Sequence, residues 1–270
     1  MELIMLGTGN AMVTRCYNTC FVLRSGEQHL LVDGGGGNTL LRRLQEAHID
    51  WRDLRTIFVT HKHIDHILGI AWMMRLICQN MAQGTYEGEA TIYAHSQVID
   101  LLRTLARGLL QENHLRFLDK GLHLVAVEDR ESRELIGRST TFFDIGSTKD
   151  RQFGFSMDLG SGKKLTCCGD EPYHDCEESY VRGSSTRPSA CTVRLMYSIP
   201  MKSTTPPWPM PAAWPENWGW RIWCSIIPRT KISPGARSST PGRAANTSPA
   251  GSISPMTWSA SNSKNGGADP

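Results

Sequence analysis

The sequence predicts an α+β fold in which hairpin-linked strands form packed sheets covered by helices. Short runs rich in β-branched and apolar residues are separated by glycine-containing turns, as in antiparallel hairpins. Segments with apolar residues three and four positions apart lie between these runs and indicate interleaved helices. The fold is expected to occupy residues 1–185, because the composition changes abruptly at residue 186.

The first predicted strand, at 3–6, leads into the glycine-containing turn 7–11. Glycine in this turn can adopt positive φ or bring the backbone close to a ligand. The turn lacks the lysine and serine of a P-loop, which argues against a phosphate loop. The next predicted elements are strands at 19–23 and 29–33, a turn at 25–27, and a helix through Leu40, Leu41 and Leu44 capped by Asn38.

Helices and strands alternate through the rest of residues 1–185. The helix after residue 66 is expected to bury one apolar face, with Met73 and Met74 as core fillers. That face comprises Leu68, Ala71, Trp72, Leu76 and Ile77. The other predicted elements are strands at 56–60, 90–94, 122–127, 140–145, 153–159 and 164–168, and a helix through Val98, Leu101, Leu102 and Leu105 capped by Ser96.

Three histidines and an aspartate occur within six residues, directly after the apolar strand 56–60. In a tight loop at the end of a strand, His61 with His63 and Asp65 with His66 form two clusters, and each cluster suits one metal ion. Imidazole and carboxylate ligands together favour zinc, and less selectively iron or manganese. The alternative is a polar loop with chance histidines, an interpretation that suits one histidine better than three.

Composition and chain patterns exclude several classes of protein. No segment approaches the length needed to span a bilayer. The start, at 1–7, lacks the basic residues and apolar length of a signal peptide, so a cytoplasmic location is expected. The eight cysteines form no C-x-x-C pair, and adjacent Cys167 and Cys168 point to opposite faces of a predicted strand. Free buried thiols are therefore expected instead of disulfides or a cysteine zinc site.

These motifs together resemble the metallo-β-lactamase superfamily, and in particular its ribonuclease Z-like branch, over about residues 1–185. The resemblance is carried by the segments 7–11, 60–66, 142–149 and 169–173. It implies a four-layer αββα sandwich that holds two metal ions. It also implies that His61 and His63 bind one ion, that Asp65 and His66 bind the other, and that Asp170 bridges them. Taken alone, Asp170 fits equally well as a turn residue.

The resemblance implies a metal-dependent hydrolase of the ribonuclease Z-like or phosphodiesterase type. Two divalent ions that share a water lower its pKa from 15.7 toward about 7, and the resulting hydroxide attacks a phosphodiester. Asp65 is the expected catalytic residue, because its carboxylate can orient the hydroxide and accept its proton. RNA is a candidate substrate, although the sequence shows no insertion long enough to grip tRNA. The sequence is also compatible with assembly into a homodimer.

Two positions depart from the family pattern. Gly146 stands where related sequences carry a ligand histidine, and residues 186–270 contain no histidine to supply the expected C-terminal ligand. Weak or mononuclear metal binding and little or no turnover are therefore expected. The alternatives are an active hydrolase that recruits His174 or His95, a catalytically inactive metal-binding module, and a truncated pseudoenzyme. His174 by itself is interpreted as a solvated loop residue.

Residues 186–270 differ from the rest of the chain in proline, tryptophan, histidine and charge content. They hold 13 of the 14 prolines, six of the eight tryptophans, and nine Lys/Arg against two Asp/Glu, a net charge of +7. Translation one nucleotide out of frame would account for this segment. With suitable codons for 186–191 and a preceding C, the shifted frame reads His-Glu-Ala-Phe-Cys-Leu, and codons for 200–207 and 224–231 can likewise be chosen to give strings that resemble the family. We expect a frameshifted, disordered tail and poor solubility. The alternative is a genuine basic tail that makes weak phosphate contacts.

Overall fold

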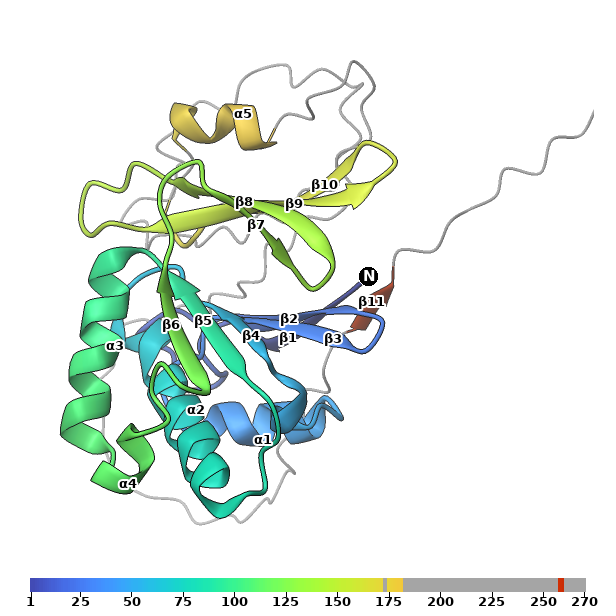
Figure 1. The fold of residues 1–270 in the computed structure, drawn as a ribbon. Helices are drawn as coiled ribbons and strands as arrows, with labels where there is room; N and C mark the ends of the chain where they lie inside the picture. Colours follow the sequence, from blue (N-terminus) through green and yellow to red (C-terminus); the bar gives the residue numbers. More distant parts are fainter. Residues whose placement is uncertain (172–173, 182–256, 260–270) are drawn as a thin grey trace, which may run out of the picture.

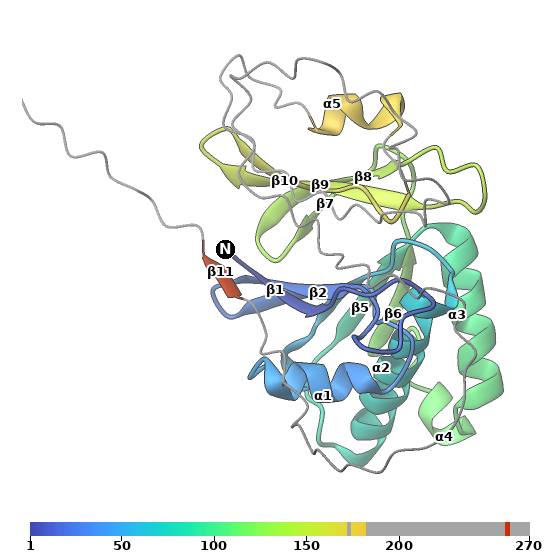
Figure 2. The same ribbon diagram turned by 180° about the vertical axis from the view of Figure 1, so that it is seen from behind.

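The computed structural model describes residues 1–171, 174–181 and 257–259. Two β-sheets pack face to face, with helices α1 to α4 outside the first sheet and α5 outside the second (Figures 1 and 2). The four layers follow the order helix, sheet, sheet, helix. The predicted α+β, αββα architecture is therefore confirmed.

The first sheet has the strand order β11-β1-β2-β3-β4-β5-β6. Its strands are β1 (Glu2–Gly7), β2 (Cys20–Ser25), β3 (Gln28–Val32), β4 (Thr56–Phe58), β5 (Ala90–Ala94), β6 (Leu122–Ala126) and β11 (Thr257–Ser259). β1 to β3 pair antiparallel, whereas β3 to β6 run parallel. Parallel strands end at the same edge, so the loops after β3, β4 and β5 lie next to one another.

The second sheet is fully antiparallel in the order β10-β9-β8-β7. Its strands are β7 (Ser132–Leu135), β8 (Arg138–Asp144), β9 (Phe153–Gly160) and β10 (Lys163–Cys167). β7 was not predicted, because three of its four residues are exposed and polar. Such an edge strand carries no apolar alternation that the sequence could reveal.

The helices are α1 (Thr39–Glu46), α2 (Ile64–Gln83), α3 (Ser96–Leu109), α4 (Glu112–Leu115) and α5 (Glu178–Val181), with short 3₁₀ turns at Trp51–Asp53 and Asp175–Glu177. Among the described residues, none of these helices combines the length and apolar character needed to cross a membrane.

Aromatic side chains fill the space between the two sheets. Phe58 stacks on Phe142 with ring centroids 5.2 Å apart and meets Phe155 edge-on at 5.5 Å. Cys167 belongs to this core, whereas Cys168 packs on the opposite face of the second sheet. Both side chains are buried and neither is part of a disulfide, which confirms the expectation for this pair.

The structure corrects the predicted geometry of α2. This helix begins at Ile64, so Asp65 and His66 lie in its first turn and not in a loop. Met73 and Met74 are core residues as predicted, but Trp72 is 39% exposed. The buried face of α2 therefore differs from the predicted one. Because α2 is apolar around most of its circumference, packing against neighbouring elements determines which side is buried, and the periodicity of apolar residues does not.

Two predicted helix caps also differ. Asn38 occupies the N-cap of α1, but its side chain makes no capping hydrogen bond. His95, not Ser96, occupies the cap position of α3.

Most of the predicted tail, 186–270, lies outside the described residues. Within it, β11 pairs antiparallel with the edge strand β1, with Leu3 opposite Trp258 (Figure 1). Apart from 257–259, which form β11, the predicted domain boundary after residue 185, the frameshift and the disorder of the tail concern residues outside the described part of the chain.

Candidate metal centre

The predicted ligands gather at the edge of the first sheet where its parallel strands end. His61 follows β4 and is fully buried. Its Nε2 lies 2.8 Å from Nδ1 of the half-buried His63, and its Nδ1 lies 2.9 Å from Oγ1 of Thr60. These short contacts fix the orientation of both rings, because each one engages a specific ring nitrogen.

Asp33, directly after β3, is a site residue that the sequence did not single out. One carboxylate oxygen accepts the backbone N–H of Thr60 at 2.8 Å. The other accepts the Thr60 hydroxyl at 2.9 Å and Nδ1–H of His66 at 2.8 Å. The signal that identifies Asp33 is its place after a strand parallel to β4, and this pairing appears only in the fold.

The proton positions of the first histidine pair follow from these contacts. A carboxylate only accepts, so the Thr60 hydroxyl donates to Asp33 and accepts from Nδ1–H of His61. For the same reason Nε2 of His63, 3.0 Å from Oδ2 of Asp150, carries a proton. With both rings neutral, two unprotonated nitrogens therefore face each other 2.8 Å apart. A cation between them stabilises that arrangement, so the residues fit a metal ion.

Asp170 and Asp65 complete the cluster. Oδ2 of Asp170 lies 3.6 Å from Nε2 of His61 and 3.4 Å from Nε2 of His66. Asp65 is buried in the first turn of α2, with Oδ2 3.6 Å from the same nitrogen of His66. His61, His63 and Asp170 each offer a ligand atom, and these three atoms lie within 4.8 Å of one another. The structure thus brings all five predicted ligands to one place.

The electrostatics of the metal-free cluster favour positive charge between Asp33 and Asp170. Burial opposes the charged form of His66, but Asp33 and Asp170 raise the pKa of His66 to about 10. Burial also raises the pKa of Asp170, yet the hydrogen bond to His66 and the positive charge of His66 hold that pKa well below its usual range. Burial, reinforced by His66, lowers the pKa of His61 to about 2. A metal ion that replaces the His66 proton satisfies the same carboxylates.

The structure gives the two histidines considered as substitute ligands surroundings of their own. His174 stands before a 3₁₀ turn, with Nε2 3.8 Å from Glu171. His95 is fully buried after β5 and packs on Phe153, with ring centroids 5.4 Å apart. Burial and the charge of Arg151 lower the pKa of His95 to about 4. Neither histidine belongs to the group of ligand atoms formed by the described residues around His61.

Gly146 follows β8 and has a left-handed backbone, with φ of +72°. Its N–H donates to Asp144 at 2.9 Å. A Cβ at this position would lie 3.1 Å from Sγ of Cys176, so a larger residue requires a small shift of that side chain. The loop between β8 and β9 contains no histidine, so it offers no imidazole as a metal ligand.

Two glycine contacts hold the start of α2 against the loop that follows Asp33. The N–H of Gly34 donates to the carbonyl of His66 at 2.8 Å, and the N–H of Gly69 donates to the carbonyl of Gly35 at 3.0 Å. A Cβ on Gly69 would lie 1.8 Å from the carbonyl oxygen of Gly34. Only glycine permits this close backbone approach, which places Asp65 and His66 beside Asp33.

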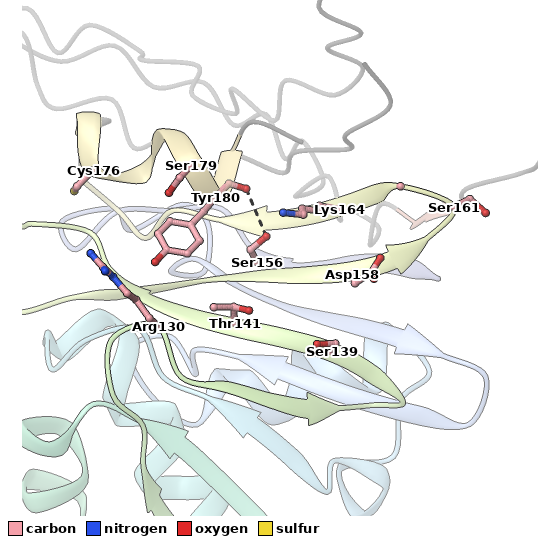
Figure 3. Close-up of a pocket in the computed structure, with 11 residues that line it drawn as sticks. Arg130, Ser139, Thr141, Ser156, Asp158, Ser161, Lys164, Cys176, Ser179 and Tyr180 are labelled. Carbon is pink, nitrogen blue, oxygen red and sulfur yellow. Dashed lines mark hydrogen bonds between the residues drawn. The ribbon is translucent and has the colours of Figure 1, made fainter. Parts of the chain in front are cut away.

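A separate cavity of about 750 Å³ lies on the outer face of the second sheet, next to α5 (Figure 3). Hydroxyl side chains and two cationic side chains line it, and none of the five predicted metal ligands does. The carbonyl of Tyr180 accepts hydrogen bonds there from Thr166 and Ser156, at 3.0 Å and 3.5 Å. The cavity is therefore distinct from the histidine cluster.

The family model of the anti-Pycsar protein Apyc1 matches residues 1–181. The chain belongs to the Apyc1 family. A ribonuclease Z of Pseudomonas putida strain F1 is 38% identical over 77 residues, which are 27% of the chain and 24% of that relative. Another, from P. putida strain GB-1, is 30% identical over 138 residues, which are 48% of the chain and 38% of that relative. The Apyc1-family chain thus spans less than two fifths of either relative.

Solved structures show the same fold. The metallo-β-lactamase fold protein YhfI of Bacillus subtilis superposes with a TM-score of 0.55 at 17% identity, over 71% of the Apyc1-family chain and 70% of YhfI. The short form of human tRNase Z superposes with a TM-score of 0.53 at 19% identity, over 71% and 76% of the two chains. The predicted metallo-β-lactamase superfamily membership, of the ribonuclease Z-like type, is confirmed. The sequence relatives that match parts of the chain are named ribonuclease Z.

Proposed function

We propose that this Apyc1-family chain carries the metal site of a hydrolase that cleaves phosphodiesters. The observation that carries the proposal is the convergence of imidazole nitrogens and the Asp170 carboxylate within a few ångströms of one another. Second-sphere oxygens orient the imidazoles, as is usual for metal-ligating histidines. Structural hydrogen bonding alone does not require this many ionisable side chains in one buried place.

Each predicted ligand has a defined place in the proposed site. His61 and His63 hold one ion, Asp65 and His66 hold the other, and Asp170 lies between the two positions. Bound divalent ions supply the nucleophile by lowering the pKa of a coordinated water to about 7. The buried carboxylate of Asp65 orients the attacking water and accepts its proton. Zinc suits this mixture of imidazole and carboxylate, and manganese and iron are weaker alternatives.

A phosphodiester is the proposed substrate class, because paired cations stabilise the charge that develops on its non-bridging oxygens. RNA is one such substrate, and the relatives named ribonuclease Z support it. We further propose a cytoplasmic protein, with a homodimer as the assembly to test first.

A catalytically inactive metal-binding module, or a truncated pseudoenzyme, is the second candidate. Gly146 favours it, because this position offers no ligand near the site. The tail lacks histidine and adds no imidazole to replace it. We therefore expect the chain as translated to hold at most one ion tightly and to turn over slowly.

Zinc stoichiometry on the purified full-length chain tests both candidates, with hydrolysis of bis(4-nitrophenyl) phosphate as the activity assay. We expect binding of no more than one tight ion, and its loss in His61→Ala. Two tightly held ions would contradict the inactive-module candidate. A folded chain that binds no zinc, manganese or iron would overturn the metal site altogether.

Gly146→His tests whether the missing ligand limits the site. We expect this variant to bind more metal per chain than the parent. Gly146→Ala is the matched control, because it introduces the same left-handed strain, about 1 kcal/mol, without a ligand. Equal metal content in the two variants would show that position 146 does not limit metal binding.

A further inference from the structure

The loop between β8 and β9 reaches across to the histidine motif through one carboxylate. Oδ1 of Asp150 accepts a hydrogen bond from Nζ of Lys62 at 2.6 Å. Oδ2 of the same side chain accepts from Nε2 of His63 at 3.0 Å. Asp150 is 87 residues from His63 in sequence, so this contact exists only because the two sheets pack together.

The position of Asp150 is fixed on both sides. Asp144 ends β8 and accepts the N–H of Gly146 at 2.9 Å and Nε–H of Arg151 at 3.0 Å. The N–H of Phe153, the first residue of β9, donates to the carbonyl of Thr60 at 3.0 Å. The loop is thus tied to the residue that precedes His61, and Asp150 is held beside the motif.

The contact with Asp150 decides which nitrogen of His63 faces the cluster. A proton on Nε2 leaves Nδ1 unprotonated when the ring is neutral. That Nδ1 is the atom 2.8 Å from Nε2 of His61. If Nδ1 carried the proton instead, His63 would direct a hydrogen into the place where the ligand atoms converge.

Asp150 therefore orients the ring of His63 in the same way that Asp33 orients the ring of His66. In each pair a carboxylate accepts from one ring nitrogen and leaves the other nitrogen to face the cluster. The two carboxylates differ in environment, because Asp33 is buried and the Asp150 side chain is 31% exposed. Lys62 compensates by holding the second oxygen of Asp150.

We propose that Asp150 is a positioning residue of the metal site: it holds His63 as the Nε2–H tautomer, so that Nδ1 is the ligand atom. This inference rests on the proposed metal-dependent function. It assigns the loop between β8 and β9 a role through an acidic side chain, independent of any ligand at position 146.

Metal affinity is the first test, measured by competition between the full-length chain and a chelating dye for Zn²⁺. Loss of an outer partner of a metal-bound histidine weakens binding about 10- to 100-fold, and partial exposure places Asp150→Ala at about 10-fold. Asp150→Asn keeps an acceptor oxygen and is expected to recover most of the affinity. Asp100→Ala removes the same charge from an exposed site on α3 and is expected to leave affinity unchanged.

The tautomer of His63 is the second test, read from ¹⁵N chemical shifts of the metal-free chain at alkaline pH. We expect Nε2–H in the parent and in Asp150→Asn, and a mixture of tautomers in Asp150→Ala. Equal affinities together with an unchanged His63 tautomer in Asp150→Ala would overturn the proposal. A parent chain that binds no metal would overturn the proposed function, while the tautomer measurement would still decide the role of Asp150.

Discussion

Each histidine of the motif bonds to a protein oxygen through one ring nitrogen. Thr60 serves His61, Asp150 serves His63, and Asp33 serves His66. The other nitrogen of each ring faces another ligand of the cluster. The orientation of each ring is therefore set before any metal arrives, which lowers the free-energy cost of organising the site on binding.

Asp33→Asn is expected to weaken zinc binding by about 10- to 100-fold, because an amide has one acceptor oxygen in place of two and cannot serve the Thr60 N–H together with the Thr60 hydroxyl and His66. Asparagine tolerates the left-handed backbone of this position, where φ is 58°, so the fold is expected to persist. Competitive zinc titration measures the effect, and circular dichroism checks the fold. Asp53→Asn, at an exposed site, is the control. Parent-like affinity in Asp33→Asn would exclude the proposed orienting role.

His95 is expected to make the chain sensitive to acid. Its pKa is about 4 in the folded state and about 6.5 when exposed, so the unfolded chain binds more protons between these values. The stability that neutral His95 contributes is complete above pH 6.5 and is lost as the pH falls toward 4. The loss is on the order of 3 kcal/mol at most.

Urea unfolding between pH 4 and pH 7 tests this effect of His95. We expect stability to depend less steeply on pH in His95→Gln than in the parent chain, whatever the absolute stability of the variant. His114→Gln, on the short helix α4, is the matched control and is expected to keep the parent slope. Identical slopes in the parent and His95→Gln would show that His95 is not buried in its neutral form.

At the scale of elements, α2 connects the core to the metal site. Its C-terminal part packs Met73, Met74 and Ile77 into the core, and its first turn presents Asp65 and His66 to the cluster. The glycine contact between Gly69 and Gly34 sets the distance between this helix and the loop that carries Asp33. Core packing and ligand geometry therefore depend on the same helix.

Gly69→Ala is expected to destabilise the fold by about 3 kcal/mol, because a methyl group cannot fit 1.8 Å from a backbone oxygen. The displaced first turn of α2 should also weaken zinc binding. Gly108→Ala is the matched helical control, since nothing lies within 4 Å of the added methyl group, and it is expected to stabilise α3 by roughly 1 kcal/mol. Thermal unfolding and zinc titration measure both effects. A Gly69→Ala variant as stable as the parent would mean that the backbones separate at little cost.

At the scale of the whole molecule, the family match and the compositional break fall at nearly the same place. The match to the family model ends at residue 181, and the composition changes at residue 186. We propose that residues from about 186 onward are translated out of frame, so that the chain lacks the C-terminal part of the domain. The nucleotide sequence around codon 185 tests this proposal directly, and an uninterrupted frame matching the translated tail would refute it.

The full-length chain is expected to be poorly soluble, because a domain without its C-terminal part leaves apolar faces and sheet edges uncovered. Sedimentation and differential scanning calorimetry measure this property. A soluble chain with one cooperative melting transition would contradict the expectation. Restoring the inferred frame should then improve solubility, and an equally insoluble restored chain would place the cause elsewhere.

Local patterns predicted most of the fold. The spacing of apolar residues identified the strands from β1 to β6 and from β8 to β10, together with α1, α2 and α3. It missed β7, whose side chains are mostly exposed, and it selected the wrong face of α2 around Trp72. Both errors arise where burial depends on neighbours and not on the periodicity of the segment itself.

The sequence by itself predicted the superfamily and the five candidate ligands, because the motifs that carry the resemblance are a property of residue type and order. The tertiary structure decided how those ligands are held. It placed β3 beside β4, so that Asp33 bonds to Thr60 and His66, and it brought Asp150 to His63 across 87 residues. Strand order and sheet packing create these contacts, and no short-range pattern specifies which distant segments become neighbours.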